Sequence, residues 1–247
     1  MIKTILCGLC SSLILAACGS NNNAPASGNN THAPVDTRDT VKGVTTAEFQ
    51  DSITPGQILE RFKAGNKRFL DGKMVHRDYL SQIDLTAKGQ HPFAMIVSCI
   101  DSRKPAEIIF DKGIGDMFNA RIAGNFVNTD ILGSLEFACK VSGAKLILIM
   151  GHTDCGAIKS ACDGVKLGNI TAMLANITPA VNAVKGFDQQ RTSANKAFVE
   201  AVARQNVLMT KEKILKESPI IKEMVDKGEV IIEGCMYDLQ NGSVNFY

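Results

Sequence analysis

The 247-residue sequence lacks tryptophan altogether, has only three tyrosines and four histidines, and shows no excess of either charge. Its 27 basic and 25 acidic residues give a formal net charge of +2 at pH 7, which does not indicate a nucleic-acid partner. No internal repeat is visible. Hydrophobic residues nevertheless make up 45% of the chain and charged residues 21%, which is ordinary for a globular protein with one substantial core.

An apolar run opens the chain, but it is too short to span a membrane. Residues 1–17 have the charged start and apolar middle of a secretory signal peptide. Residues 15–19 (LAACG) resemble a bacterial lipobox, which predicts cleavage before Cys18 and lipidation of Cys18; an ordinary signal cleaved after Ala17 is the alternative. Because Gly19 and not aspartate follows Cys18, we expect a periplasmic, lipid-anchored protein in the outer membrane rather than the inner membrane.

The segment that follows the leader is rich in Asn, Ala, Pro, Ser, Gly and Thr. It has few large apolar side chains and therefore cannot form a core. We expect residues 18–46 to comprise the lipidated cysteine and a disordered tether, and residues 47–247 to form the folded domain.

Two uninterrupted apolar runs, residues 93–97 and 145–150, have the length of strands and read like strands buried on both faces of a parallel sheet. Between them, residues 129–141 have apolar side chains at helical spacing and Thr129 as a candidate N-cap, which predicts a crossover helix. Further strands are expected at residues 117–122, 229–237 and 243–246, the last two joined by a turn at Asn241-Gly242.

Other helices are expected from apolar spacing and capping residues at 54–71, 156–161, 170–184, 193–216 and 219–228. Together these patterns predict an α/β fold with a mostly parallel sheet of four or five strands flanked by helices.

Each of the two apolar runs ends in potential metal ligands. Cys99 and Asp101 follow the first run, and His152 and Cys155 follow the second. Because ligands gather at the carboxyl ends of parallel strands, we expect these four side chains in one crevice. Two thiols, an imidazole and a carboxylate are donors that suit tetrahedral zinc, so we predict one Zn²⁺ per chain.

The other cysteines do not form a disulfide framework. Once the cysteines of the leader, the lipobox and the predicted zinc site are set aside, an odd number remains: Cys139, Cys162 and Cys235. A redox module or a non-catalytic, structural zinc module is the alternative from another functional class. It is disfavoured because Cys99 and Cys155 are not a Cys-x-x-Cys pair and structural sites more often use four Cys or His ligands.

The motif Cys99-x-Asp101-x-Arg103, followed by His152-x-x-Cys155-Gly, closely resembles the β-class carbonic anhydrases over roughly residues 54–247. The resemblance implies that Cys99, His152 and Cys155 are permanent zinc ligands. It implies that Asp101 either takes the fourth position or releases it to water while bound to Arg103. The implied reaction is the reversible hydration of CO2 to bicarbonate and a proton by a zinc-bound hydroxide. A related branch hydrolyses CS2 or COS by the same chemistry, and the sequence leaves that substrate open.

The resemblance also implies a substrate pocket. Gln90 matches a family glutamine that holds a substrate oxygen, and Phe118, Ala123 and Phe137 match positions that line the apolar CO2 pocket, where the family usually has tyrosine in place of Phe137. Gly156 begins a helix whose backbone amides offer a place for bicarbonate. Because family pockets are built partly by the neighbouring subunit, the resemblance implies a homodimer or homotetramer.

A subset of the family is inhibited by bicarbonate bound in a second pocket made by a tryptophan, a valine and an arginine. The matching positions here are Ile96, Lys104 and Arg121, so only the arginine is retained. We therefore do not expect this form of inhibition.

Overall fold

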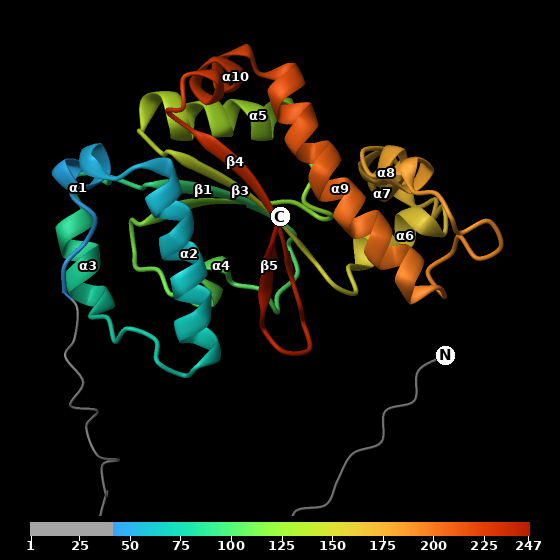
Figure 1. Cartoon of the computed structure of the whole chain (residues 1–247), viewed down its shortest axis with the longest axis horizontal. Helices are drawn as coiled ribbons and strands as arrows, with labels where there is room; N and C mark the ends of the chain where they lie inside the picture. The colour runs from blue at the N-terminus through green and yellow to red at the C-terminus, as the bar shows by residue number, and fades with distance from the viewer. Residues whose placement is uncertain (1–41) are drawn as a thin grey trace, which may run out of the picture. The chain divides into compact units, whose positions relative to one another are not determined.

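A five-stranded sheet with the order β2-β1-β3-β4-β5 lies between helices (Figure 1). The computed structural model describes residues 42–247. The predicted signal peptide, Cys18 and the greater part of the predicted tether lie outside these residues. Within residues 42–247, no helix combines the length and the apolar character needed to cross a membrane.

The strands are β1 (Ala94–Ser98), β2 (Met117–Arg121), β3 (Leu146–His152), β4 (Ile231–Tyr237) and β5 (Val244–Phe246). The first four are parallel, and β5 returns antiparallel to β4. Every residue of β1 and β3 is buried, as their uninterrupted apolar sequences predict. The predicted α/β fold with a mostly parallel sheet is confirmed.

The order in which successive strands are added to the sheet reverses at β1. From β1 the chain crosses to β2 on one side and then returns to β3 on the other side. Ser98, the last residue of β1, is paired with both Arg121 of β2 and Met150 of β3. Strands β1 and β2 therefore end level with each other, and β3 continues two residues further, to His152. Such a reversal point opens a crevice at the carboxyl ends of the strands, which is where ligands bind in open α/β sheets.

One face of the sheet is covered by helices from the second half of the chain (Figure 1). They are α5 (Thr129–Glu136), the π-helix η1 (Phe137–Val141), α6 (Gly156–Cys162), α7 (Gly168–Ala175), α8 (Thr178–Ala183), α9 (Lys196–Glu217) and α10 (Pro219–Asp226). Their apolar side chains pack on Val97, Ile147 and Ile149 of the sheet. Helix α9 runs across both β3 and β4.

The other face is covered by the N-terminal part of the domain. Its helices are α1 (Ala47–Ser52), α2 (Pro55–Leu70), α3 (Tyr79–Thr86) and α4 (Ala106–Ile109). Helix α2 begins at a capping box formed by Thr54 and Gln57 and buries Ile58 and Phe62 against this face of the sheet. Burial of such a side chain stabilises the fold by about 1.5–3 kcal/mol.

Buried Asn66 connects α2 to the end of the chain. Its amide nitrogen donates to the carbonyl of Gly242 at 3.0 Å, and its amide oxygen accepts from the backbone amide of Val244 at 3.0 Å. Gly242 has φ +79° and lies in the predicted hairpin turn. A side chain there would be strained and would meet Phe69, so glycine is required.

The crossover helix differs from the prediction at both ends. Its N-cap is Asn128, not Thr129, because the Asn128 side chain accepts the backbone amide of Ile131 at 3.0 Å. After Glu136 the helix continues as η1, whose wider turn shifts the buried face. Val141, predicted on that face, is consequently exposed.

Residues 170–184 form two helices, α7 and α8, where the sequence pattern predicts one. Pro179 lies in the first turn of α8. It has no amide hydrogen to donate to the carbonyl of Ala175, so a continuous helix would lose that bond and clash with the proline ring.

The composition predicts a tether up to residue 46, whereas residues 42–46 contact the domain. The hydroxyl of Thr45 donates to the carboxylate of Asp116 at 2.6 Å, and the carbonyl of Gly43 accepts from the side-chain amide of Gln82 at 3.0 Å. These partners lie about 40 and 70 residues away in sequence, beyond the reach of a composition argument.

Candidate metal centre and active site

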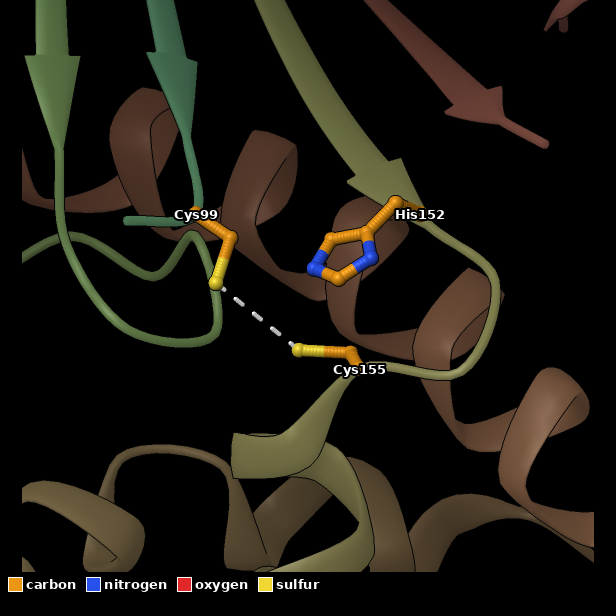
Figure 2. Close-up of side chains that lie close together, drawn as sticks. All are labelled: Cys99, His152 and Cys155. Atoms are coloured by element: carbon orange, nitrogen blue, oxygen red, sulfur yellow. Dashed lines mark hydrogen bonds between the residues drawn. The ribbon is translucent and has the colours of Figure 1, made fainter. Parts of the chain in front are cut away.

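Three of the four predicted metal ligands converge at the crevice between β1 and β3 (Figure 2). Cys99 follows β1, His152 is the last residue of β3, and Cys155 directly precedes α6. Their ligand atoms lie within 4.8 Å of one another, and all three residues are buried. Two segments more than fifty residues apart therefore meet at a single point, as predicted.

A sharp turn after β3 allows His152 and Cys155 to face each other. Asp154 has φ +56°, a left-handed conformation that aspartate tolerates better than most residues. Its exposed side chain forms an ion pair with Lys159. Asp154 thus lies outside the ligand cluster.

The separation of the two sulfurs suits a single zinc ion. The Sγ atoms of Cys99 and Cys155 are 3.9 Å apart. Two sulfurs bound tetrahedrally at about 2.3 Å from one zinc would be separated by about 3.8 Å. The protein therefore holds both thiols at the spacing that zinc requires.

The imidazole of His152 is also oriented so that it can bind a metal ion. Its Nδ1 lies 2.9 Å from the carbonyl oxygen of Thr153, which can only accept, so Nδ1 carries the hydrogen. Its buried Nε2 then presents a lone pair and has no hydrogen-bond partner within residues 42–247. A buried polar atom without a partner calls for an explanation, and a metal ion supplies one.

The electrostatics of the sulfurs also favour a cation. The hydrogen bond between the two sulfurs lowers the pKa of Cys99 to about 3 and raises the pKa of Cys155. The backbone amide of Gly124 points at Cys99 Sγ from 3.4 Å and also favours the thiolate. These hydrogen bonds favour the thiolate form of Cys99, which is the form of cysteine that binds zinc.

Asp101 lies outside this cluster, bound to Arg103. Its Oδ1 accepts from the backbone amide and Nε of Arg103, both at 3.0 Å, and its Oδ2 accepts from Nη2 at 2.7 Å. These hydrogen bonds from Arg103 hold the pKa of Asp101 well below its usual range. Of the two positions that the sequence analysis allows for Asp101, the structure has the arginine-bound one, which leaves three protein ligands at the metal site.

Comparison with known proteins agrees with the family resemblance seen in the sequence. Residues 94–244 match the family model described as carbonic anhydrase. Carbonic anhydrase 2 of Mycobacterium tuberculosis is 33% identical over 199 residues, covering 77% of this chain and 92% of that protein. The carbonic anhydrase of Mycolicibacterium smegmatis is 31% identical over 196 residues, with the same coverage of both proteins.

The chain belongs to the β-class carbonic anhydrases. Solved structures agree in fold. The β-carbonic anhydrase CcaA matches with a TM-score of 0.59 at 24% identity, covering 78% of this chain and 88% of that chain. A Coccomyxa β-carbonic anhydrase in complex with acetazolamide matches with a TM-score of 0.59 at 23% identity, covering 78% of this chain and 84% of that chain. The predicted zinc cofactor is confirmed by family membership together with the cluster of Cys99, His152 and Cys155.

The five substrate-pocket positions carried over from this family fall into three groups. Ala123 and Gly156 adjoin the metal site, because their chain neighbours Gly124 and Cys155 touch or belong to it. Phe118 and Phe137 line a depression of about 630 Å³ beside edge strand β2, and Phe137 is 55% exposed.

Gln90 lies elsewhere. It is exposed and precedes β1, whereas Cys99 follows β1. The five residues of β1 span about 16 Å, so Gln90 and the metal ligands lie at opposite ends of the sheet within one chain.

Two basic residues support the metal-binding loop in a way that the sequence did not reveal. Arg121 donates from Nε to the carbonyl of Cys99 at 3.2 Å and from Nη2 to the carbonyl of Asp101 at 2.5 Å. Lys104 is completely buried, and its Nζ donates to the carbonyl of Met150 at 3.4 Å. Burial lowers the pKa of Lys104 to about 8. The family resemblance places Arg121 and Lys104 only at a second bicarbonate pocket. The burial of Lys104 is not visible in the sequence, because this lysine lies in a short polar loop.

The three other cysteines within residues 42–247, Cys139, Cys162 and Cys235, are free thiols. Cys139 and Cys235 are buried, and Cys162 is half-buried. Burial raises the pKa of Cys139 to about 12 and of Cys162 to about 11. These thiols are protonated at neutral pH and behave as small apolar side chains.

Proposed function

We propose that this protein catalyses the reversible hydration of CO2 to bicarbonate and a proton at one zinc ion per chain. The observation that carries the proposal is the convergence of the thiols of Cys99 and Cys155 with the unpartnered Nε2 of His152. The carboxylate of Asp101 is bound to Arg103 and lies outside this cluster. Zinc, when bound by Cys99, His152 and Cys155, supplies a Lewis acid that makes water nucleophilic near neutral pH. Three protein ligands rather than four are typical of catalytic zinc sites.

Asp101 orients the attacking water and accepts its hydrogen bond. Its Oδ1 is occupied by two bonds from Arg103, whereas Oδ2 accepts a single bond and retains a free lone pair. Arg103 keeps the carboxylate ionised, because its bidentate hydrogen bonds favour the charged form. This pairing also keeps Asp101 from occupying the position that the reaction needs.

The substrate pocket is completed by a second subunit. Phe118 and Phe137 form an apolar surface at edge strand β2, suited to CO2 and to a neighbouring chain. A copy related by a two-fold axis perpendicular to edge strand β2 would place its own β2 antiparallel to this one. Its amino edge, with Gln90, would then lie toward the end of the sheet that carries this chain's metal site. Solved structures include two tetrameric β-carbonic anhydrases from Sordaria macrospora, one of which matches this chain at 24% identity with a TM-score of 0.57. Either a homodimer or a homotetramer satisfies this arrangement.

The reaction takes place outside the cytoplasm in this proposal. The signal-like residues 1–17 and the lipobox at Cys18 support export, lipidation and attachment to the periplasmic side of the outer membrane. Labelling of cells with radioactive palmitate tests this: the wild-type chain is expected to incorporate label and Cys18→Ser to lose it. Equal labelling of both would overturn the anchor.

Metal analysis joined to a stopped-flow CO2-hydration assay tests the activity. The wild-type protein is expected to contain one zinc per chain and to hydrate CO2, and Cys155→Ser to lose both. Cys162→Ser is the matched control, since Cys162 is a free thiol at the end of α6, the helix that Cys155 precedes, and lies outside the cluster. Loss of zinc in both variants would contradict the assignment.

Hydrolysis of CS2 or COS remains the alternative substrate choice, because the same site could attack either molecule. Comparing the turnover of all three gases decides between them, and we expect CO2 to be fastest. A non-catalytic zinc or redox module, the other alternative, predicts no turnover of any of the three.

A further inference from the structure

A second cavity, of about 570 Å³, lies at the opposite end of the sheet from the metal site. Its walls come from residues 43–45, helices α1 and α2, and the turn that precedes β2. Phe93, which lines it, precedes β1, whereas Cys99 follows β1, so a strand of about 16 Å separates the two sites.

The charged residues of this cavity are predominantly basic. Four cations line it, Arg61, Arg68, Arg77 and Lys112, against two carboxylates, Asp111 and Asp116. Cavities of this size that combine apolar walls with a few polar groups are typical of small-molecule sites.

Both carboxylates are already satisfied. Asp111 is bound by Arg68 at 2.5 Å and by Arg77, and its oxygens also accept the backbone amide of Val75. Asp116 accepts from the hydroxyl of Thr45 at 2.6 Å and from a backbone amide of the same turn at 2.7 Å. Arg68 and Arg77 therefore share one carboxylate, whose single negative charge offsets one of their two positive charges.

Arg61 and Lys112 are left without a carboxylate partner. Apart from its position 4.9 Å from the ring of Phe49, the guanidinium of Arg61 makes no hydrogen bond or ion pair with any residue from 42 to 247. Lys112 is only 6% exposed, and its Nζ donates to the carbonyls of Phe110 at 2.9 Å and Arg61 at 3.1 Å. Its Nζ also lies 4.8 Å from the centre of the Phe62 ring, and one of its three N–H groups makes no hydrogen bond within residues 42–247.

A buried cation without a counter-ion is costly, and a bound anion would offset that cost. Burial lowers the pKa of Lys112 to about 8, against the favourable charge of Asp116 and with further lowering by the charges of Arg68 and Arg61. The free donors therefore face a site where positive charge is in excess. Phe49 and Phe93 provide an apolar wall beside them.

We propose that this cavity binds a small oxyanionic ligand, whose phosphate or carboxylate group is held by Arg61 and Lys112 and whose apolar part contacts Phe49 and Phe93. The site is distinct from the zinc centre and does not depend on the proposed carbonic anhydrase activity. Phosphate and carboxylate share the chemistry that Arg61 and Lys112 recognise, so the test uses a probe of each kind.

Calorimetric titration of the purified, zinc-loaded protein with inorganic phosphate and with benzoate tests the proposal. We expect at least one probe to bind, and the tighter one identifies the class of ligand. Arg61→Gln should weaken that binding about tenfold or more, because a charge-assisted hydrogen bond is lost. Lys63→Gln is the matched control, since Lys63 has the same charge on the same helix but pairs with Glu60 outside the cavity.

CO2 hydration measured without either probe should be the same in Arg61→Gln and in the wild type, so failure of this proposal is separable from failure of the proposed function. Lys112→Met should weaken binding to a similar extent; because Arg61 is exposed, its variant remains informative even where the buried Lys112 variant fails to fold. Binding of neither probe, unchanged binding in Arg61→Gln, or equal weakening in Lys63→Gln would overturn the proposal.

Discussion

Asp101 and Asp111 are ten residues apart, and each is bound by arginine, yet their surroundings differ. The side chain of Asp111 is completely buried and is held by two arginines, Arg68 and Arg77. Asp101 is held by Arg103 alone, whose side chain is 55% exposed. The first carboxylate has no route to another partner, whereas the second lies at the rim of the metal crevice.

Pairing of aspartate with arginine therefore stabilises the fold at Asp111 and positions a reactive carboxylate at Asp101. Burial raises the pKa of Asp111, but the hydrogen bonds from Arg77 and Arg68 together outweigh burial and lower it. For Asp101 the hydrogen bond from Arg103 is the largest influence on the pKa, and it outweighs burial, the next largest, which raises the pKa. A carboxylate with one solvent-exposed partner can exchange that partner for water or metal, which a doubly bound, buried carboxylate cannot do.

Asp111→Asn should produce the largest change in stability. Removing the charge leaves Arg68 and Arg77 close together without their shared partner, and breaking a buried ion pair costs about 3–5 kcal/mol. Urea unfolding measures the loss. Asp101→Asn is the control and should lower the free energy of unfolding clearly less. Equal losses in the two variants would show that Asp101 and Asp111 contribute alike to stability.

Asp101→Ala should instead act on the reaction. We expect the rate of CO2 hydration to fall by about 10²–10³-fold with zinc content unchanged, because the attacking water loses the acceptor that orients it. Stopped-flow rates and metal analysis on one preparation give both quantities. A fully active variant would remove Asp101 from the mechanism, and loss of zinc would make it a ligand.

Arg103→Lys sharpens the comparison further. Lysine retains the charge but cannot donate two parallel hydrogen bonds to a carboxylate, so Asp101 would be less firmly oriented. The expected effect is a decrease of about tenfold in kcat, smaller than that of Asp101→Ala. A decrease equal to that of Asp101→Ala would mean that Arg103 takes part in the reaction directly.

The smallest effect concerns pH. The folded-state pKa of Asp111 is lowered, so the unfolded chain binds its proton more readily and Asp111 stabilises the fold more as pH rises. That contribution is fully present above the unfolded pKa of about 3.9 and is lost as pH falls through the folded value. The difference in unfolding free energy between the wild type and Asp111→Asn should shrink below about pH 4. A constant difference would contradict the account.

The sequence could predict the fold and the metal ligands because both are encoded locally. Buried parallel strands leave uninterrupted apolar runs, and each run is followed within two residues by a metal ligand, Cys99 after the first and His152 after the second. The residues at which α2 and α10 begin were also predictable, since Thr54 and Ser218 are N-capping residues followed by proline.

Contacts between distant residues were not predictable in this way. Arg68 and Arg77 lie 43 and 34 residues before Asp111, and each reads as an ordinary surface charge in the sequence. Lys104 and Lys112 likewise follow polar neighbours, and only the packing of other segments over them shows that they are buried. The division of residues 170–184 into two helices, by contrast, could have been predicted from Pro179.

X-ray absorption spectroscopy at the zinc K-edge tests the central claim most directly. For the purified protein, the account predicts two sulfur ligands at about 2.3 Å and at least one nitrogen ligand at about 2.0–2.1 Å. A first shell without sulfur, or one made of four sulfurs, would contradict it.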